Sequence, residues 1–289
     1  MKKLILLSIL FFIGCVTEPE VEGCIDNSAC NYDLNATKDD GSCTYAEINY
    51  DCEGNCFDGY TELNWYDGAC YYDEDISTAG QFQALYGSLY ENIFANGLGL
   101  TWHEGKVIAV FIGVQPVNQN NILDIIFKFK SLLEIDIMFK NIGSIPSTIG
   151  ELTNLTKFST YNCSMEGTIP SEFWNLVNLT ELTFFNDDLT EGGLSGSIPE
   201  EIGNLTNLDY LTITGQELTG AIPNNISNLS KLKYFDIWDN KFTSLPESFC
   251  NLPEDCEIYV SGNCLSEEYH YDCIDDWDTD GNYLQTNCP

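Results

Sequence analysis

The amino-acid sequence predicts an α/β solenoid built from stacked repeats. Three observations predict this fold. Apolar residues recur in near-identical segments, the recurrence has a steady period, and the cysteines gather at the two ends of the repeated region. A single repeat has too little apolar surface to fold alone, so successive repeats must stack into one continuous core.

Residues 1–14 have the features of a secretory signal peptide. Lys2 and Lys3 precede an apolar run, residues 4–13, that is too short for a membrane span, which needs about 20 residues. The next residues, Gly14 and Cys15, resemble a bacterial lipobox, in which the cysteine becomes the lipidated N-terminus. The alternative is an ordinary secretory signal with an incidental cysteine. We expect a protein of the bacterial cell envelope, surface-exposed on the outer membrane and touching the membrane only through the lipid on Cys15.

The composition excludes one class of partner. The chain has 45 acidic and 11 basic residues, a formal net charge of −34, and every basic residue is a lysine. So large a negative charge repels nucleic acid, and the arginine fork that grips phosphate with two hydrogen bonds is missing. We therefore expect no nucleic-acid partner.

An acidic linker, residues 15–23, leads into a cysteine-rich module, residues 24–75. Export favours disulfides over a zinc site here, and six cysteines allow fifteen pairings, which the sequence leaves open. The strings D-D-G-S-C and Y-D-C-E-G-N-C resemble a small acidic module of secreted bacterial proteins. The six cysteines of the module are Cys24, Cys30, Cys43, Cys52, Cys56 and Cys70.

Two acidic strings are candidate calcium sites, and no other cofactor is expected. Calcium prefers six to eight oxygen ligands. The first string contains Asp33, Asn35, Asp39 and Asp40, for which Asx turns in a loop are the alternative. The second contains Asp276, Asp278 and Asp280 and matches the first half of an EF-hand loop, although Asn287 stands where a bidentate acid is needed.

The following residues, 76–106, are expected to cap the solenoid. Apolar residues recur at near-helical spacing over residues 78–96, which predicts a capping helix. Such a helix would cover the open end of the core before the first repeat.

Residues 107–265 carry the repeats. Residues 155–170, 208–223 and 232–246 show the same pattern, from Leu-x-x-Leu or Leu-x-x-Phe to Ile-Pro or Leu-Pro. They resemble the plant-type leucine-rich repeat, L-x-x-L-x-L-x-x-N-x-L-x-G-x-I-P. The resemblance implies parallel strands on a concave face and irregular or 3-10 turns on a convex face.

One apolar position of each strand serves as a marker of the period. The markers are Val110, Ile135, Phe158, Leu182, Leu211, Phe235 and Ile258, at intervals of 23 to 29 residues. Residues 187–193 contain a five-residue insertion and should form a loop. The resemblance gives the asparagine five residues after a marker the task of bonding neighbouring backbone. Asn240 and Asn263 fit this position, Gln216 is a poorer fit, and Cys163 is expected there as a buried thiol.

Residues 266–289 are expected to form a second, C-terminal cysteine-rich cap. Five cysteines surround the last strand and the tail. Because five is odd, we expect either that one of them is free or that Cys163 is not an inert thiol. They are Cys250, Cys256, Cys264, Cys273 and Cys288.

The sequence favours binding over catalysis. The acids are too abundant for carboxylate pairs to be informative, and His103-Glu104 starts like a zinc-protease motif but Val107 replaces the second histidine. Aromatic side chains that point outward from the strands are typical of interface hot spots, with ordinary strand propensity as the alternative. The candidate ligand-binding residues are Asp136, Met138, Tyr161, Phe185, Thr214, Asp236 and Trp238.

The sequence therefore predicts a non-catalytic surface protein that binds an extracellular protein, peptide or glycan with its concave face. Two other functions stay open. One is a structural, calcium-dependent component of an extracellular matrix or of adhesion, and the other is a glycan-processing enzyme.

Overall fold

A computed structural model describes residues 20–47, 49–58, 60–62, 70–75, 77–79, 98–104, 106–113, 122–138, 142–187, 193–276 and 288. The chain divides into two compact units, Met1–Asp58 and Gly59–Pro289. The predicted cysteine-rich module, residues 24–75, thus spans the boundary between the units. No helix in the described ranges is long and apolar enough to span a membrane.

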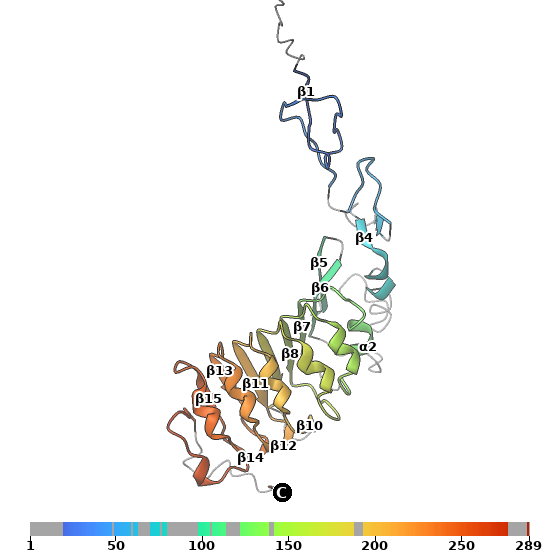
Figure 1. Cartoon of the computed structure of the whole chain (residues 1–289). Coiled ribbons are helices and arrows are strands. Elements are labelled where there is room, and N and C mark those ends of the chain that lie inside the picture. Colours follow the sequence, from blue (N-terminus) through green and yellow to red (C-terminus); the bar gives the residue numbers. More distant parts are fainter. Residues whose placement is uncertain are drawn as a thin grey trace, which may run out of the picture. The chain divides into compact units, whose positions relative to one another are not determined.

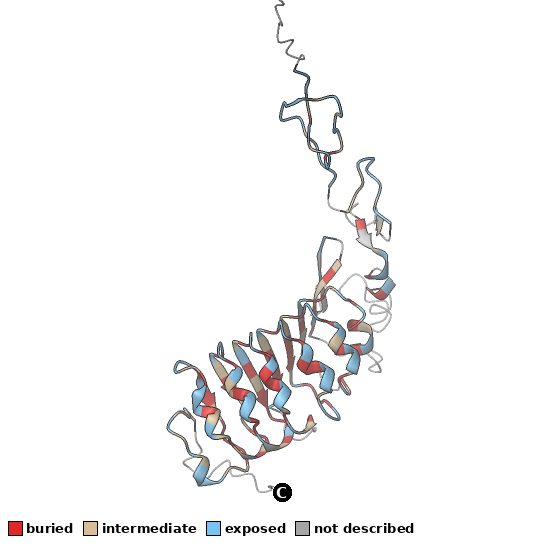
Figure 2. Ribbon diagram, in the orientation of Figure 1, coloured by how far each residue is buried: buried red, intermediate tan, exposed pale blue. Residues whose placement is uncertain are grey.

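Disulfides and turns hold the first unit together. Its strands β1 (Glu22–Gly23) and β2 (Lys38–Asp39) pair in parallel, and Cys24–Cys43 and Cys30–Cys52 are disulfides. Cys56 is also disulfide-bonded, as is Cys70 of the second unit. Most side chains of the first unit are exposed or half-buried (Figure 2). Disulfides therefore stabilise this unit in place of an apolar core, as is typical of small disulfide-rich modules.

The second unit begins with two antiparallel strand pairs. Strands β3 (Tyr60–Glu62) and β4 (Cys70–Tyr72) form the first pair, and β5 (Leu98–His103) and β6 (Lys106–Ile112) form the second. Strand β5 is an edge of the main sheet, so the described end of the predicted capping region is strand. The predicted helix over residues 78–96 lies almost wholly outside the described residues.

The main sheet has eight strands in the order β15-β13-β11-β9-β8-β7-β6-β5, and it is parallel from β6 to β15 (Figure 1). Strand pairing places Val110, Ile135, Phe158, Leu182, Leu211, Phe235 and Ile258 side by side. All seven predicted markers are therefore confirmed. The remaining strands of this sheet are β7 (Glu134–Ile137), β8 (Lys157–Tyr161), β9 (Glu181–Phe185), β11 (Tyr210–Thr214), β13 (Tyr234–Asp236) and β15 (Glu257–Tyr259).

Helical turns cover one side of the sheet (Figure 1). They are the helix α2 (Ile122–Ile126) and the 3-10 segments η2 (Ser147–Glu151), η3 (Ser171–Asn175), η4 (Glu200–Asn204), η5 (Asn224–Asn228) and η6 (Glu247–Asn251). A proline precedes each of these five 3-10 segments with φ between −67° and −85°. The proline of each Ile-Pro or Leu-Pro pair thus fixes where the chain turns from extended to helical.

A smaller parallel sheet follows the turn of the later repeats. It contains β10 (Ser195–Gly196), β12 (Glu217–Ala221) and β14 (Lys241–Ser244). One turn residue beside it must be glycine. Gly215 has φ +63°, and a Cβ atom there would lie 1.7 Å from the carbonyl oxygen of Asn186. Only glycine permits this close approach to Asn186, the residue that directly precedes the insertion.

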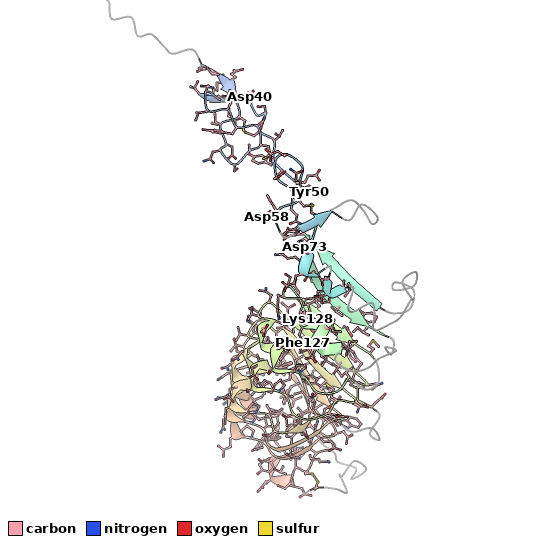
Figure 3. All side chains as sticks on the ribbon, turned by 90° about the vertical axis from the view of Figure 1, so that its right-hand side faces the viewer. Asp40, Tyr50, Asp58, Asp73, Phe127 and Lys128 are labelled. Atoms are coloured by element: carbon pink, nitrogen blue, oxygen red, sulfur yellow. A yellow bond between two sulfur atoms is a disulfide. The ribbon has the colours of Figure 1, made fainter. Side chains whose placement is uncertain are left out.

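The core is one apolar layer between the sheet and the helical turns, as the burial colours show (Figure 2). The seven marker residues all lie within it, each at most 2% exposed. Phe127, which follows α2, is buried in the same layer, whereas its neighbour Lys128 is exposed (Figure 3). Stacking of repeats thus makes one continuous core, as the period predicts.

In the last three repeats, the amide side chain five residues after the marker bonds the backbone of the turn. Asn240 Nδ2 donates to the carbonyl oxygens of Ile213 and Ile237 at 2.7 and 3.1 Å. Gln216 also bonds backbone groups of two repeats: its Oε1 accepts the Leu194 N–H at 2.9 Å, and its Nε2 donates to the Thr214 carbonyl at 3.1 Å. The prediction that Gln216 fits poorly is therefore wrong, since its longer side chain still reaches these groups.

Cys163 occupies the same position in an earlier repeat. Its buried thiol lies 3.4 Å from the carbonyl oxygens of Ile137 and Tyr161. These carbonyls correspond to Ile213 and Trp238 around Asn240, which donates to both. The prediction of a buried thiol at this position is confirmed.

Described residues of the C-terminal tail lie against the last strand of the sheet. Disulfides Cys250–Cys273 and Cys264–Cys288 tie the tail to the last repeat, and the N–H groups of Asp275 and Asp276 donate to the Ile258 carbonyl of β15. Cys256 is a buried free thiol, so its place among the predicted disulfide cysteines is wrong. Burial and the carboxylate of Asp255 raise the pKa of this thiol to about 12.

Candidate binding face

The outward-pointing side chains of strands β6 to β15 form what we call the strand face, which has three rows. Residues two apart along a strand share one face of a sheet. Row 1 contains Glu134, Lys157, Glu181, Tyr210, Tyr234 and Glu257. Row 2 contains Phe111, Asp136, Ser159, Thr183, Thr212, Asp236 and Tyr259. Row 3 contains Gly113, Met138, Tyr161, Phe185, Thr214, Trp238 and Ser261.

Row 3 holds most of the predicted ligand-binding residues. Met138 is 47% exposed, and Tyr161, Phe185 and Trp238 are half-buried. The rings of Tyr161 and Phe185 lie side by side, with centroids 6.3 Å apart. The row therefore presents a partly exposed apolar surface on neighbouring strands, interrupted at β11.

The interruption is Thr214, and its predicted exposure is wrong. Its side chain is only 1% exposed, although strand alternation points it outward. It lies between the larger neighbours Phe185 and Trp238 in a row where each strand is about 4.8 Å from the next. Small side chains between large ones are covered even when they do not belong to the core.

Row 2 also has buried small side chains at its centre, and each half of the row carries one acid that the sequence predicts to bind ligand. Ser159 and Thr183 are buried, whereas Asp136 and Asp236 are half-buried. Burial raises the pKa of the Asp236 carboxyl, and hydrogen bonds from the Trp238 N–H and the Tyr234 hydroxyl oppose this increase. Burial of this carboxyl therefore disfavours its charged form, and the two hydrogen bonds partly offset the cost of desolvation.

The other acid, Asp136, belongs to a charge network on β7, β8 and β9. Lys157 Nζ lies 3.7 Å from Asp136 Oδ2 and 3.1 Å from Glu181 Oε1. Burial disfavours the charged lysine, but the hydrogen bond and charge of Glu181 raise its pKa. Burial also raises the pKa of Asp136, against the charge of Lys157. On this half of the face, Lys157 and the carboxylates of Asp136 and Glu181 thus compensate one another's charge.

Row 1 contains aromatic residues that the sequence reasoning missed. Tyr210 is 47% exposed, and Tyr234 lies beside it on β13. The ring of Tyr234 is 5.3 Å from the ring of Tyr259 in row 2. The signal was present in the sequence, since period-two alternation also points the residue before each marker outward.

Two polar atoms of the strand face have no partner. In the described ranges, the buried side-chain nitrogen and oxygen atoms without a hydrogen bond are Asp136 Oδ1 and Thr214 Oγ1. Buried polar groups are nearly always satisfied, and each exception needs an explanation. Both exceptions lie on this one face.

The predicted calcium ligands of the first unit bond their own loop. Asp33, Asp39 and Asp40 each accept an N–H from two residues ahead, at 2.8 to 3.0 Å, which is the Asx-turn alternative (Figure 3 labels Asp40). In the ranges that the structure describes, no three acidic, histidine or cysteine side chains are grouped to hold a metal ion. The calcium hypothesis stays a prediction.

The remaining predicted site residues have varied places. Asp276 Oδ2 accepts the Ser261 hydroxyl at 2.6 Å, beside the last strand of the face. Asp278, Asp280 and the predicted lipidation site Cys15 lie outside the described residues.

Comparisons with known proteins bear on the fold. The family model of the leucine-rich repeat matches residues 231–252. No curated protein matches the chain.

Solved structures are similar over larger parts of the chain. A plant ice-binding protein has 22% identity over 68% of this chain and 65% of its own, with a TM-score of 0.53. The PEPR1–AtPEP1 structure has 20% identity over 67% of this chain and 28% of that one, with a TM-score of 0.52. The plant peptide hormone receptor RGFR1 in complex with RGF2 has 34% identity over 49% of this chain and 22% of that one, with a TM-score of 0.45.

This chain spans only 22% to 65% of the length of those three proteins. The repeat match, the likenesses in fold and the parallel sheet with 3-10 turns agree on one architecture. The second unit is a leucine-rich-repeat solenoid.

Proposed function

We propose that this chain is a non-catalytic binding protein that takes up an extracellular protein, peptide or glycan on its strand face. We also propose that it is exported and lipid-anchored at Cys15, on the surface of a bacterial outer membrane. The signal-like segment and the lipobox-like cysteine support this location, and the disulfides are consistent with export to an oxidising compartment.

The observation that carries the binding proposal is the partly exposed apolar row of the strand face. Met138, Tyr161, Phe185 and Trp238 keep large apolar surfaces accessible on a rigid sheet. Aromatic residues that are held in place lose little entropy when they bind, and they dominate the energy of many interfaces. Row 3 is thus suited to anchor a ligand that lies across the strands.

The test uses ligands selected without bias. The exported chain, residues 15–289, is exposed to a phage library of random 12-residue peptides and to a printed glycan array. The wild-type chain should retain a defined set of ligands. Alanine at Tyr161, Phe185 and Trp238 together should weaken their binding by at least about tenfold, because each truncation removes a candidate anchor.

The matched control is Val177→Ala, which removes a 47% exposed apolar side chain next to a 3-10 segment. This variant should bind like the wild type. Equal binding by the triple variant, with an unchanged melting temperature, would move the site off the strand face.

A further inference from the structure

The C-terminal half of the strand face contains a regular arrangement of two tyrosines and two acids. Strand pairing puts Tyr234 opposite Glu257 and Asp236 opposite Tyr259. Along each strand, a tyrosine and an acid are two residues apart. Tyrosines therefore occupy one diagonal of a square and carboxylates the other; we call these four residues the tyrosine–acid square.

Hydrogen bonds and ring contacts hold this square. The Tyr234 hydroxyl donates to Asp236 Oδ2 at 3.3 Å, and the Tyr259 hydroxyl donates to Glu257 Oε2 at 3.2 Å. The two rings meet with centroids 5.3 Å apart and planes inclined by 38°. A phenol that donates to a carboxylate has a more electron-rich ring, which strengthens its attraction for a cation.

The charge around the square is negative. Asp275 and Asp276 lie beside β15, where Asp275 Oδ2 accepts the Ile258 N–H at 2.7 Å. Among the described residues, the nearby lysines are engaged elsewhere, because Lys233 Nζ is bound to Asp209 at 2.8 Å and Lys157 belongs to the network on β8. The square thus lacks the compensation that Lys157 supplies to the other half of the face.

We propose that the tyrosine–acid square binds a cationic side chain, arginine or lysine, of an extended protein ligand. This inference rests on the proposed function, since the ligand must lie across the strand face. The cation contacts the two ring faces, and the carboxylates of Asp236 and Glu257 attract its charge. The neighbouring Trp238 and Phe185 of row 3 contact apolar side chains of the same ligand.

The arrangement favours an organic cation over a metal ion. Both oxygens of Asp236 already accept hydrogen bonds, from the Trp238 N–H at 2.9 Å and from the Tyr234 hydroxyl. Calcium takes six to eight oxygen ligands, and among the described residues no three acidic, histidine or cysteine side chains are grouped to hold a metal ion. A guanidinium or ammonium group needs no such ligand set, because the ring faces attract it directly.

The test is a double-mutant cycle between ligand and protein. Peptides are selected from the random 12-residue phage library on the wild-type chain, residues 15–289, and synthesised with each arginine replaced by citrulline or each lysine by norleucine. These replacements keep the shape of the side chain and remove its charge. One basic residue should matter, and its replacement should weaken wild-type binding by about tenfold.

The same replacement should have a much smaller effect on the Tyr234→Leu/Tyr259→Leu variant, because the ring faces that hold the cation are gone and only the two carboxylates remain. Glu172→Gln/Glu201→Gln, which removes two exposed acids from 3-10 segments, should keep the full tenfold effect. This control separates the square from the general attraction of basic peptides to an acidic protein. Melting temperatures establish that the variants are folded, and Tyr234→Phe/Tyr259→Phe, which keeps both rings, should retain part of the effect.

The possible failures are distinguishable. Selected peptides that need row 3 but show no basic residue coupled to the square would overturn this inference and leave the proposed function standing. If the wild-type chain retains no more peptides or glycans than its row 3 triple-alanine variant, both proposals fall.

Discussion

Single polar side chains join the repeats of this solenoid to one another. Asn263 repeats the bonds of Asn240, since its Nδ2 donates to the Ile237 carbonyl at 2.8 Å and its Oδ1 accepts the Phe242 N–H at 3.0 Å. Each such amide satisfies buried backbone groups of two successive repeats. An unsatisfied buried backbone group costs about as much as a lost hydrogen bond, so these residues matter more than their number suggests.

Substitution of one of these residues should be costly. Asn240 is completely buried, and leucine there removes its hydrogen bonds to the Ile213 carbonyl and the Leu218 N–H, together with one of the two amide donors to the Ile237 carbonyl. We expect Asn240→Leu to lower the free energy of unfolding by about 3 kcal/mol, measured by urea denaturation followed by tryptophan fluorescence. The exposed Asn251→Ala should stay within about 0.5 kcal/mol of the wild type. An equal effect of the two substitutions would contradict this role.

At the scale of elements, the open ends of the sheet need protection. An uncovered edge strand offers unpaired backbone groups and exposes the core of the last repeat. Here the tail after residue 265 pairs with β15 through Asp275 and Asp276 and is tied down by two disulfides. The cap is therefore part of the fold rather than an appendage.

Removal of one of these disulfides should destabilise the C-terminal end of the solenoid and leave the other repeats unaffected. Cys250 and Cys273 are 23 residues apart, a separation for which a disulfide contributes about 3 kcal/mol. Cys250→Ala/Cys273→Ala should lower stability by about that amount, and hydrogen exchange should accelerate in η6 and β15 before it does in β7 and β8. Cys256→Ala, which keeps both disulfides, serves as the control. Uniform acceleration along the sheet would show that the cap does not act locally.

At the scale of the whole molecule, the pKa values of several aspartates shift in opposite directions in the two units. In the first unit, hydrogen bonds lower the pKa of Asp26, Asp40 and Asp51, first among them the bonds from Ser28, Ser42 and Asn55. In the second unit, burial raises the pKa of Asp75, Asp136 and Asp236. These three carboxyls therefore favour folding of the first unit in their charged form, whereas the three of the second unit disfavour it.

This contrast predicts opposite responses to acid. A lowered pKa gives stability that is present above the ordinary value of 3.8 and is lost as the pH falls through the lower folded value. A raised pKa means that the folded state binds the proton first, so stability rises as the pH falls from neutral toward 3.8. The second unit should therefore become more stable on mild acidification.

The Asp236→Asn variant isolates one carboxyl. Its urea denaturation, followed by tryptophan fluorescence, should show a smaller gain in stability than the wild type between pH 7 and the acid range. All five tryptophans belong to the second unit, so this signal reports on that unit. Asp26→Asn, in the first unit, should leave this signal unchanged. A variant that gains as much as the wild type would mean that Asp236 ionises normally in the folded protein.

The sequence by itself determined the solenoid and the register of its strands. Val110 to Ile258 recur with a period that only stacked repeats explain, and prolines and glycines mark each turn, so local chemistry and the global fold agree. Period-two alternation also gave which side chains point outward, including the row 1 tyrosines that were overlooked.

Only the tertiary structure decided which of these outward side chains are accessible. Thr214 and Ser159 point outward yet are buried, because exposure depends on the size of neighbours from other strands. It also decided that Gln216 replaces asparagine and that Cys256 stays reduced, since both depend on distances between residues far apart in the chain. A period fixes the direction of a side chain, whereas its environment is the sum of contacts that no single repeat contains.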